Sequence, residues 1–99
     1  MPIHSFKLFV TGDAPRGRSA AQALDALCRH HLSKDYEIEV VNVLERPEEA
    51  EEYRIIVTPA VVKLRPPPPR RAVGDLREAE AVMRALSIVP EIAEPSEND

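Results

Sequence analysis

The sequence predicts a single mixed α/β domain, on two observations. Stretches in which apolar and polar side chains alternate, as in strands, are interspersed with stretches in which apolar residues recur every three or four positions, as in helices. The 99 residues are enough to enclose one hydrophobic core but not two. We expect this domain to cover residues 1–89, followed by an acidic, disordered tail over residues 90–99.

The first half of the chain predicts a strand, a helix and a second strand. The alternating stretch 5–10 is the first strand, and 36–44 is the second. Between them, residues 19–32 have apolar side chains at helical spacing, and Ser19 with Gln22 forms a plausible capping box at the start. This order is a βαβ unit, so the two strands should be parallel.

Residues 46–56 predict a short second helix. Pro47 suits its first turn, where a missing N–H costs nothing, and the glutamates that follow favour the positive end of the helix dipole. Arg54 near the other end complements the same dipole. We expect the acidic run to form a solvated helix face.

The remaining sequence predicts a third strand over 60–65, an edge strand over 70–74 and a closing helix over 75–88 with Asp75 as its N-cap. Four consecutive prolines separate the two strands; because they lack N–H groups, they block strand pairing and stiffen the turn. The complete order, βαβ followed by αββα, is that of the thioredoxin-like fold.

Charge and hydropathy argue against nucleic-acid and membrane partners. The formal net charge is −4, but four of the 17 acidic residues lie in residues 91–99, so the rest of the chain carries equal numbers of acids and bases. A neutral body is a poor binder of nucleic acid. No apolar run approaches the length needed to span a bilayer, and the N-terminus lacks the features of a signal peptide. We expect a cytoplasmic protein.

Residues for catalysis, metal binding or cofactor binding are not grouped in the sequence. Cys28, the single cysteine, lies on the apolar stripe of the first helix and is expected to be a buried core thiol. His30 and His31 are adjacent, so on a helix they cannot chelate one metal as a pair four residues apart would. A thiol oxidoreductase is disfavoured because the loop after the first strand has no cysteine. We expect no enzymatic activity and no cofactor.

Basic residues cluster between the second strand and the last helix. Each alone is typical of a solvated surface, but together, on strand ends and loops of a rigid core, they suit an acidic protein partner. The cluster consists of Arg46, Arg54, Lys63, Arg65, Arg70 and Arg71.

Three stretches give the chain a family resemblance: "KLFVTGDAP", "VVNVLERPEEAEEYRIIVTPAVVKL" and "PPPPRRAVGDL". In this order and at this separation they resemble the circadian clock protein family KaiB, over roughly residues 5–88. The resemblance implies a non-enzymatic protein that binds the KaiC ATPase and, in complete clocks, helps to recruit regulators such as a SasA-like histidine kinase.

The same resemblance implies two folds. In one, the protein is thioredoxin-like and binds KaiC as a monomer; in the other, the C-terminal half is rearranged and the chains form a tetramer. We therefore expect a homo-oligomer, dimer or tetramer, when the protein is free. An alternative is a sensory or interaction module related to SasA-type sensor domains, without KaiC and without redox activity.

The resemblance also assigns residues. It places the KaiC-binding surface on the short helix and the segment after it, with Arg54, Ile55, Lys63, Arg70 and Arg71 as protein-binding candidates. The basic cluster described above adds Arg46 to these candidates. It assigns structural roles to Pro59, a candidate cis-proline, and to Gly74, Asp75 and Ala85.

Ala85 and Ser87 depart from the family, where many members have Gly and Asp. Because Ala is more favourable than Gly by about 1 kcal/mol in a helix interior, we expect this homologue to favour the thioredoxin-like state, in which the segment is helical. The departures also favour a simpler timing or stress system over a complete circadian oscillator.

Overall fold

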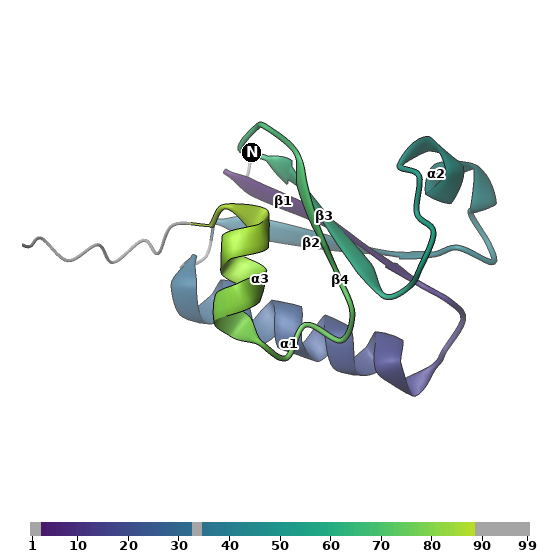
Figure 1. Cartoon of the computed structure of the whole chain (residues 1–99), viewed down its shortest axis with the longest axis horizontal. Helices are drawn as coiled ribbons and strands as arrows, with labels where there is room; N and C mark the ends of the chain where they lie inside the picture. The colour runs from purple at the N-terminus through teal and green to yellow at the C-terminus, as the bar shows by residue number, and fades with distance from the viewer. Residues whose placement is uncertain (1–2, 33–34, 89–99) are drawn as a thin grey trace, which may run out of the picture.

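The computed structural model describes residues 3–32 and 35–88. A four-stranded sheet is covered on one face by α1 and α3, while the short α2 lies at one end of the sheet, away from these two helices (Figure 1). The elements are β1 (His4–Val10), α1 (Pro15–His31), β2 (Tyr36–Asn42), α2 (Pro47–Glu52), β3 (Ala60–Arg65), β4 (Arg70–Val73) and α3 (Ala79–Leu86).

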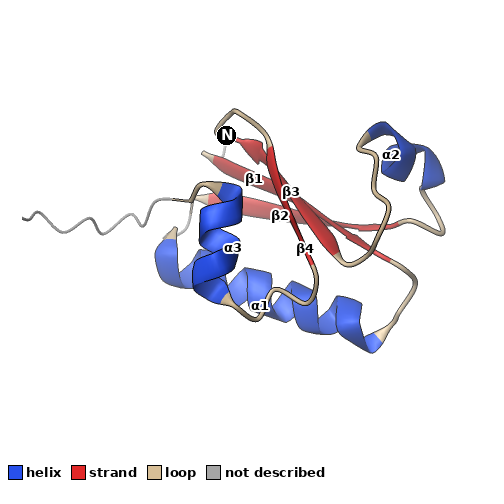
Figure 2. Ribbon diagram, in the orientation of Figure 1, coloured by secondary structure: helices blue, strands red, loops and turns tan. Residues whose placement is uncertain are grey.

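The sheet has the strand order β2-β1-β3-β4 (Figure 2). β1 pairs in parallel with β2, as the βαβ order predicts, and antiparallel with β3; β4 pairs antiparallel with β3 at the edge. The predicted order of elements is therefore confirmed, and β3 has the bounds that the alternating pattern predicts.

The main core lies between the sheet and the helices α1 and α3. In β1, Phe6, Leu8 and Val10 alternate toward this layer, and α1 presents a buried stripe at helical spacing. Gly17 lets α1 approach β1 closely, because a Cβ at this position would lie only 3.1 Å from Val10. The remaining buried members are Ala20, Leu24, Leu27, Cys28, Leu32, Val61, Leu76, Val82, Leu86 and Ile88.

α1 begins earlier than predicted, and the expected capping box is absent. The first helical residue is Pro15, and Ala14 is the N-cap without a side-chain hydrogen bond. Ser19 is an exposed residue inside the helix rather than its cap. The φ of proline is already helical, so Pro15 starts the helix where a loop was predicted.

α3 begins later than predicted. Its N-cap is Glu78, so Asp75 does not cap the helix. Gly74 and Leu76 both have positive φ, of 105° and 66°, and this turn directs Leu76 into the core. Asp75 instead accepts a hydrogen bond from the backbone N–H of Arg77 (3.3 Å) and pairs with the guanidinium of the same residue (2.9 Å). The predicted structural role of Gly74 therefore fits a turn that needs its conformational freedom.

A second, smaller cluster covers part of the other face of the sheet. Phe9, Val41 and Val62 are buried there, and Tyr53 and Ile55 pack against them from the segment that follows α2. α2 itself is shorter than predicted and has no buried residue. Its position must therefore come from contacts other than core packing.

The Thr58–Pro59 peptide bond is cis, as the resemblance implied. The bonds Arg65–Pro66 and Pro67–Pro68 are cis as well. Among residues 3–32 and 35–88, no helix combines the length and the apolar character needed to cross a bilayer.

Candidate functional site

Polar contacts from the sheet hold the N-terminal half of α2. Glu49 on α2 pairs with the ammonium of Lys7 on β1 and with the guanidinium of Arg46, the residue before the helix. Arg46 also pairs with Glu39 on β2, at 2.9 Å between Nη2 and Oε2. One helical carboxylate is thereby tied to two strands through two cations.

These contacts shift the ionisation of the groups that make them. The hydrogen bond to Glu49 raises the pKa of Lys7 above its ordinary value, and the same bond lowers the pKa of Glu49. The acceptor Glu39 raises the pKa of Arg46. The prediction of a solvated acidic face is therefore wrong for Glu49, whose side chain is only 16% exposed, although Glu48, Glu51 and Glu52 are exposed.

Tyr53 anchors the other end of α2 to the sheet. Its ring packs against the ring of Phe9, with centroids 5.6 Å apart, and the ammonium of Lys7 lies 5.3 Å from its centroid. Lys7 thus contacts both ends of α2, once through Glu49 and once through Tyr53.

The last turn of α2 ends in a Schellman-type arrangement. The N–H of Ile55 donates to the carbonyl of Ala50 (2.8 Å), and the N–H of Arg54 donates to that of Glu51 (3.0 Å). Arg54 occupies the left-handed position, with φ 55°, that glycine usually fills. Arg54 therefore lies beyond the helix end, and its backbone reverses the direction of the chain.

Arg71 on β4 completes the contacts around α2. Its guanidinium donates to the carbonyl oxygens of Tyr53 (2.7 Å) and Arg54 (3.3 Å). The edge strand after the prolines is thereby joined to the segment that follows α2.

Apolar side chains flank α2 and face solvent. We call residues 53–57 the exit segment; in it, Ile56 is 95% exposed and Val57 is 53% exposed. Leu44, before the helix, is 68% exposed. Exposed aliphatic side chains on a braced backbone are a feature of protein-binding surfaces.

The structure brings together four of the six predicted protein-binding residues. Arg46, Arg54, Ile55 and Arg71 lie around α2 and the exit segment, through the contacts described above. Their predicted role in binding stays a prediction. Sequence reasoning did not name Ile56 as a binding residue. The available signal was that Ile55, Ile56 and Val57 are three consecutive apolar residues, so they cannot all face the core.

Lys63 and Arg70 lie elsewhere. They are paired across β3 and β4, and strand alternation places them on the opposite face from Val62 and Arg71. Lys63 is 2% exposed, and burial, together with the nearby charge of Arg70, lowers its pKa. In this conformation Lys63 does not contribute to an exposed surface, whereas Arg70 does.

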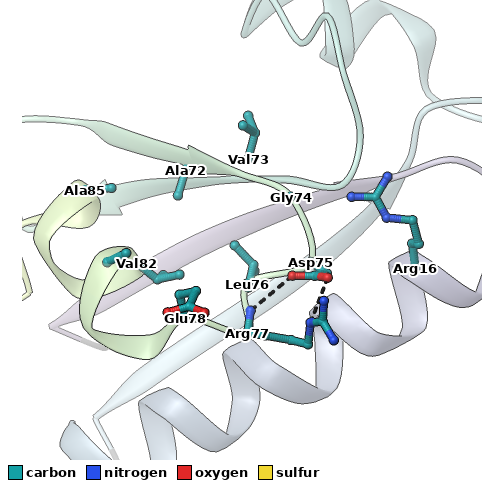
Figure 3. A pocket seen from close by; sticks show the side chains of 11 residues that line it. Arg16, Ala72, Val73, Gly74, Asp75, Leu76, Arg77, Glu78, Val82 and Ala85 are labelled. Carbon is teal, nitrogen blue, oxygen red and sulfur yellow. Dashed lines mark hydrogen bonds and ion pairs between the residues drawn. The ribbon is translucent and has the colours of Figure 1, made fainter.

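A cavity of about 400 Å³ lies where β4 turns into α3 (Figure 3). The turn at Gly74, Asp75 and Leu76 forms one wall, and Arg16 on the first turn of α1 forms another. The carboxylate of Asp75 is already paired with Arg77. In the ranges 3–32 and 35–88, no three His, Cys, Asp or Glu side chains are placed to hold a metal ion. The cavity is formed by the turn that directs Leu76 into the core, so its presence is explained by the fold.

The loop after β1 lies beside Pro59 and carries no thiol. Thr11 and Thr58 share a hydrogen bond between their hydroxyl oxygens at 2.6 Å, and a cavity of about 330 Å³ is lined by this loop and by Pro59. Cys28 is fully buried in the core, as predicted, and burial raises its pKa to about 12. A thiol with that pKa is protonated at neutral pH and is a poor nucleophile.

Solved structures with this arrangement are thioredoxin-like. The N-terminal domain of Synechococcus elongatus SasA superposes with a TM-score of 0.72 and 25% identity, over 94% of this chain and 91% of that domain. Mitochondrial thioredoxin 3 from Saccharomyces cerevisiae has a TM-score of 0.69 at 14% identity, over 90% of this chain and 81% of the thioredoxin. The second likeness is one of fold alone.

Sequence comparison is more specific. The chain is 40% identical to the circadian clock protein KaiB3 of Synechocystis sp. over 85 residues, which are 86% of this chain and 83% of that protein. It is 36% identical to the circadian clock oscillator protein KaiB of Microcystis aeruginosa over 93 residues, covering 94% and 89% of the two chains. The KaiB domain model matches residues 7–88. The chain therefore belongs to the KaiB family.

Proposed function

We propose that this protein is a non-enzymatic regulator that binds a KaiC-type ATPase through α2 and the exit segment, in a circadian or a simpler timing or stress system. Membership of a family whose curated relatives are circadian clock proteins supports this proposal. The resemblance to KaiB implies the ATPase as the partner.

The observation that carries the proposal is the exposure of Ile56. An aliphatic side chain that is 95% exposed contributes nothing to the core, yet it directly follows Arg54 and Ile55, where hydrogen bonds and Arg71 hold the backbone. A braced segment loses little conformational freedom on binding, so burying Ile56 in a partner yields most of its transfer free energy. Arg54, two residues before it and exposed, suits an acidic rim on the partner.

Ile56→Asp should weaken binding to an ATP-loaded KaiC homologue. Burying an isoleucine side chain is worth about 1.5–3 kcal/mol, which corresponds to roughly a 10- to 100-fold increase in Kd. Isothermal titration calorimetry measures the affinity, and size-exclusion chromatography of the free protein reports its oligomeric state, expected to be a dimer or tetramer.

Ile3→Asp is the matched control. Ile3 is also an exposed aliphatic residue, 55% accessible, but it precedes β1 at the end of the sheet opposite to α2. Its substitution should leave the affinity unchanged. Equal losses from the two variants, or no binding by the wild-type protein, would contradict the proposal.

The second candidate function is an interaction module that serves a sensor histidine kinase rather than an ATPase. The superposition with the SasA domain favours it. Co-elution with a histidine kinase, without co-elution with any KaiC homologue, would select this alternative.

A further inference from the structure

We propose that Arg71 is a positioning residue: it fixes the conformation of the exit segment for the partner without contacting the partner itself. This inference rests on the proposed function, because it concerns the same binding surface. It differs from the expectation that Arg71 touches an acidic partner directly.

The guanidinium of Arg71 is engaged by main-chain atoms. Nη2 donates to the carbonyl oxygen of Tyr53 at 2.7 Å, and Nη1 donates to that of Arg54 at 3.3 Å. In the described part of the chain, no backbone N–H donates to either oxygen. Carbonyls at the end of a helix carry partial negative charge and lack helical partners, so they are natural acceptors for a cation.

The two carbonyls lie on either side of the left-handed residue. The carbonyl of Tyr53 belongs to the peptide before Arg54, and the carbonyl of Arg54 belongs to the peptide after it. A non-glycine residue at φ 55° is less favourable than in its preferred conformations, because its Cβ comes close to the following carbonyl oxygen. By holding both flanking peptides, Arg71 favours the conformation that exposes Ile56.

The shape of the side chain matters in this arrangement. The planar guanidinium presents two donors in a fixed fork, whereas a lysine ammonium is a point charge on a flexible stem. Arg71→Lys therefore keeps the charge but loses the simultaneous hold on the two carbonyls. A direct contact with an acidic partner would depend mainly on the charge and would tolerate lysine.

Arg70 supplies a matched control on the same strand. It is exposed, it is the immediate neighbour of Arg71, and strand alternation directs it to the other face of the sheet. Arg70→Lys makes the same chemical change without altering the contact to the exit segment.

The test combines two measurements on Arg71→Lys, Arg71→Ala and Arg70→Lys. The first is amide exchange in the free protein, at the N–H groups of Arg54 and Ile55, which donate to Glu51 and Ala50. The second is the association and dissociation rates with an ATP-loaded KaiC homologue.

We expect both Arg71 variants to increase exchange at these two amides about tenfold or more, because hydrogen bonds from a charged donor are stronger than those from a neutral donor. Arg71→Lys should also raise the dissociation rate while leaving the association rate close to that of the wild type, since the charge is retained. Arg70→Lys should leave amide exchange at Arg54 and Ile55 unchanged, because Arg70 does not contact the exit segment.

Unchanged exchange in Arg71→Ala would overturn the proposal, as would an Arg71→Lys variant that binds like the wild type. If the wild-type protein binds no KaiC homologue, the proposed function fails and the role in binding fails with it. The exchange measurement on the free protein then still decides whether Arg71 fixes the exit segment.

Discussion

Lys63 is an almost fully buried lysine in a small protein. Its side chain shares the face of Val61, toward α1 and α3, and only 2% of the residue is exposed. Across the strand pair it faces Arg70, a like charge, and among the described residues it forms no ion pair. Burial first, and Arg70 second, lower its pKa. A buried charge without a partner opposes folding.

Lys63→Met should therefore stabilise this conformation. The substitution keeps an unbranched apolar side chain, about one atom shorter, and removes the charge. We expect an increase of about 1 kcal/mol in the free energy of unfolding, which corresponds to roughly 4–8 °C in Tm for a domain of this size. Thermal unfolding followed by circular dichroism measures it.

The pH dependence has a defined sign. Since the pKa of Lys63 is lower in the folded than in the unfolded state, the penalty of the charge is complete below the folded pKa. The penalty disappears as pH rises from the folded pKa toward the unfolded value of 10.5. The advantage of Lys63→Met should shrink over this range. Lys7→Met, which removes a paired cation, should destabilise instead; a loss of stability in Lys63→Met would contradict the burial argument.

For single residues of β3, the sequence predicted the face of the sheet on which a side chain lies better than it predicted whether that side chain is buried. The alternation in 60–65 correctly placed Val61 and Lys63 on one face and Val62 on the other. Lys63 is buried because α1 and α3 cover its face of the sheet, and contacts between residues distant in sequence decide where these helices pack. For the same reason, Lys63 was grouped with exposed basic residues.

α3 is a short helix whose composition matters to the state of the protein. It spans Ala79–Leu86, and Ala85 is one of its exposed residues. Because an exposed alanine contributes to a helix through propensity alone, we propose that Ala85 favours the helical, thioredoxin-like arrangement of the C-terminal half over the rearranged, tetrameric arrangement that the resemblance to KaiB implies.

Ala85→Gly should weaken this preference. The loss of about 1 kcal/mol of helix propensity predicts roughly a fivefold increase in amide exchange across residues 80–86. It also predicts a larger tetrameric fraction in size-exclusion chromatography. The helix propensity term acts only on the state in which this segment is helical.

Ala26→Gly is the control for Ala85→Gly. Ala26 is an exposed alanine of α1, outside the C-terminal half in which the family resemblance implies a rearrangement. Its substitution should lower stability without changing the oligomeric state. If the two variants give the same elution profile, Ala85 does not bias the fold.

Element boundaries were less predictable than element order. The sequence predicted β3 at its observed bounds, but α1 begins at Pro15 rather than Ser19, and α3 begins at Ala79 rather than at Asp75. The predicted caps, Ser19 and Asp75, are residue types that favour helix starts, whereas the observed N-caps, Ala14 and Glu78, make no side-chain cap hydrogen bond. The choice was made by packing: Gly17 fits α1 against β1, and Leu76 needs a left-handed turn to enter the core.

The molecule as a whole separates its core from its candidate binding surface. The main cluster lies between the sheet and α1 with α3, whereas α2 and the exit segment sit at the end of the sheet and contribute only Tyr53 and Ile55 to the smaller cluster (Figure 1). Folding and binding should therefore respond to different substitutions.

Leu24→Ala should destabilise the whole domain. Leu24 is fully buried in the main cluster, and removing a buried leucine costs about 2–5 kcal/mol. Ile56→Asp, at an exposed position, should change the free energy of unfolding by no more than about 0.5 kcal/mol. Urea denaturation measures both. Comparable losses in the two variants would show that the exit segment is part of the cooperative core.

The candidate site could be predicted only in part. Sequence reasoning placed it on α2 and the following segment and named Arg46, Arg54, Ile55 and Arg71. The role of Lys7, which joins β1 to both ends of α2, could not be predicted, because it depends on three-dimensional proximity across 42 residues. The main-chain contacts of Arg71 depend on the pairing of β4 with β3 in the same way.

The absence of buried residues in α2 has an evolutionary consequence. The cations that hold α2 and the segment after it belong to strands or to a flanking residue: Lys7, Arg46 and Arg71. The outward side chains of the helix can therefore mutate with little cost in folding free energy. Descendants of one ancestral scaffold can then acquire different partners by substitutions in a few neighbouring codons, while selection on the core remains unchanged.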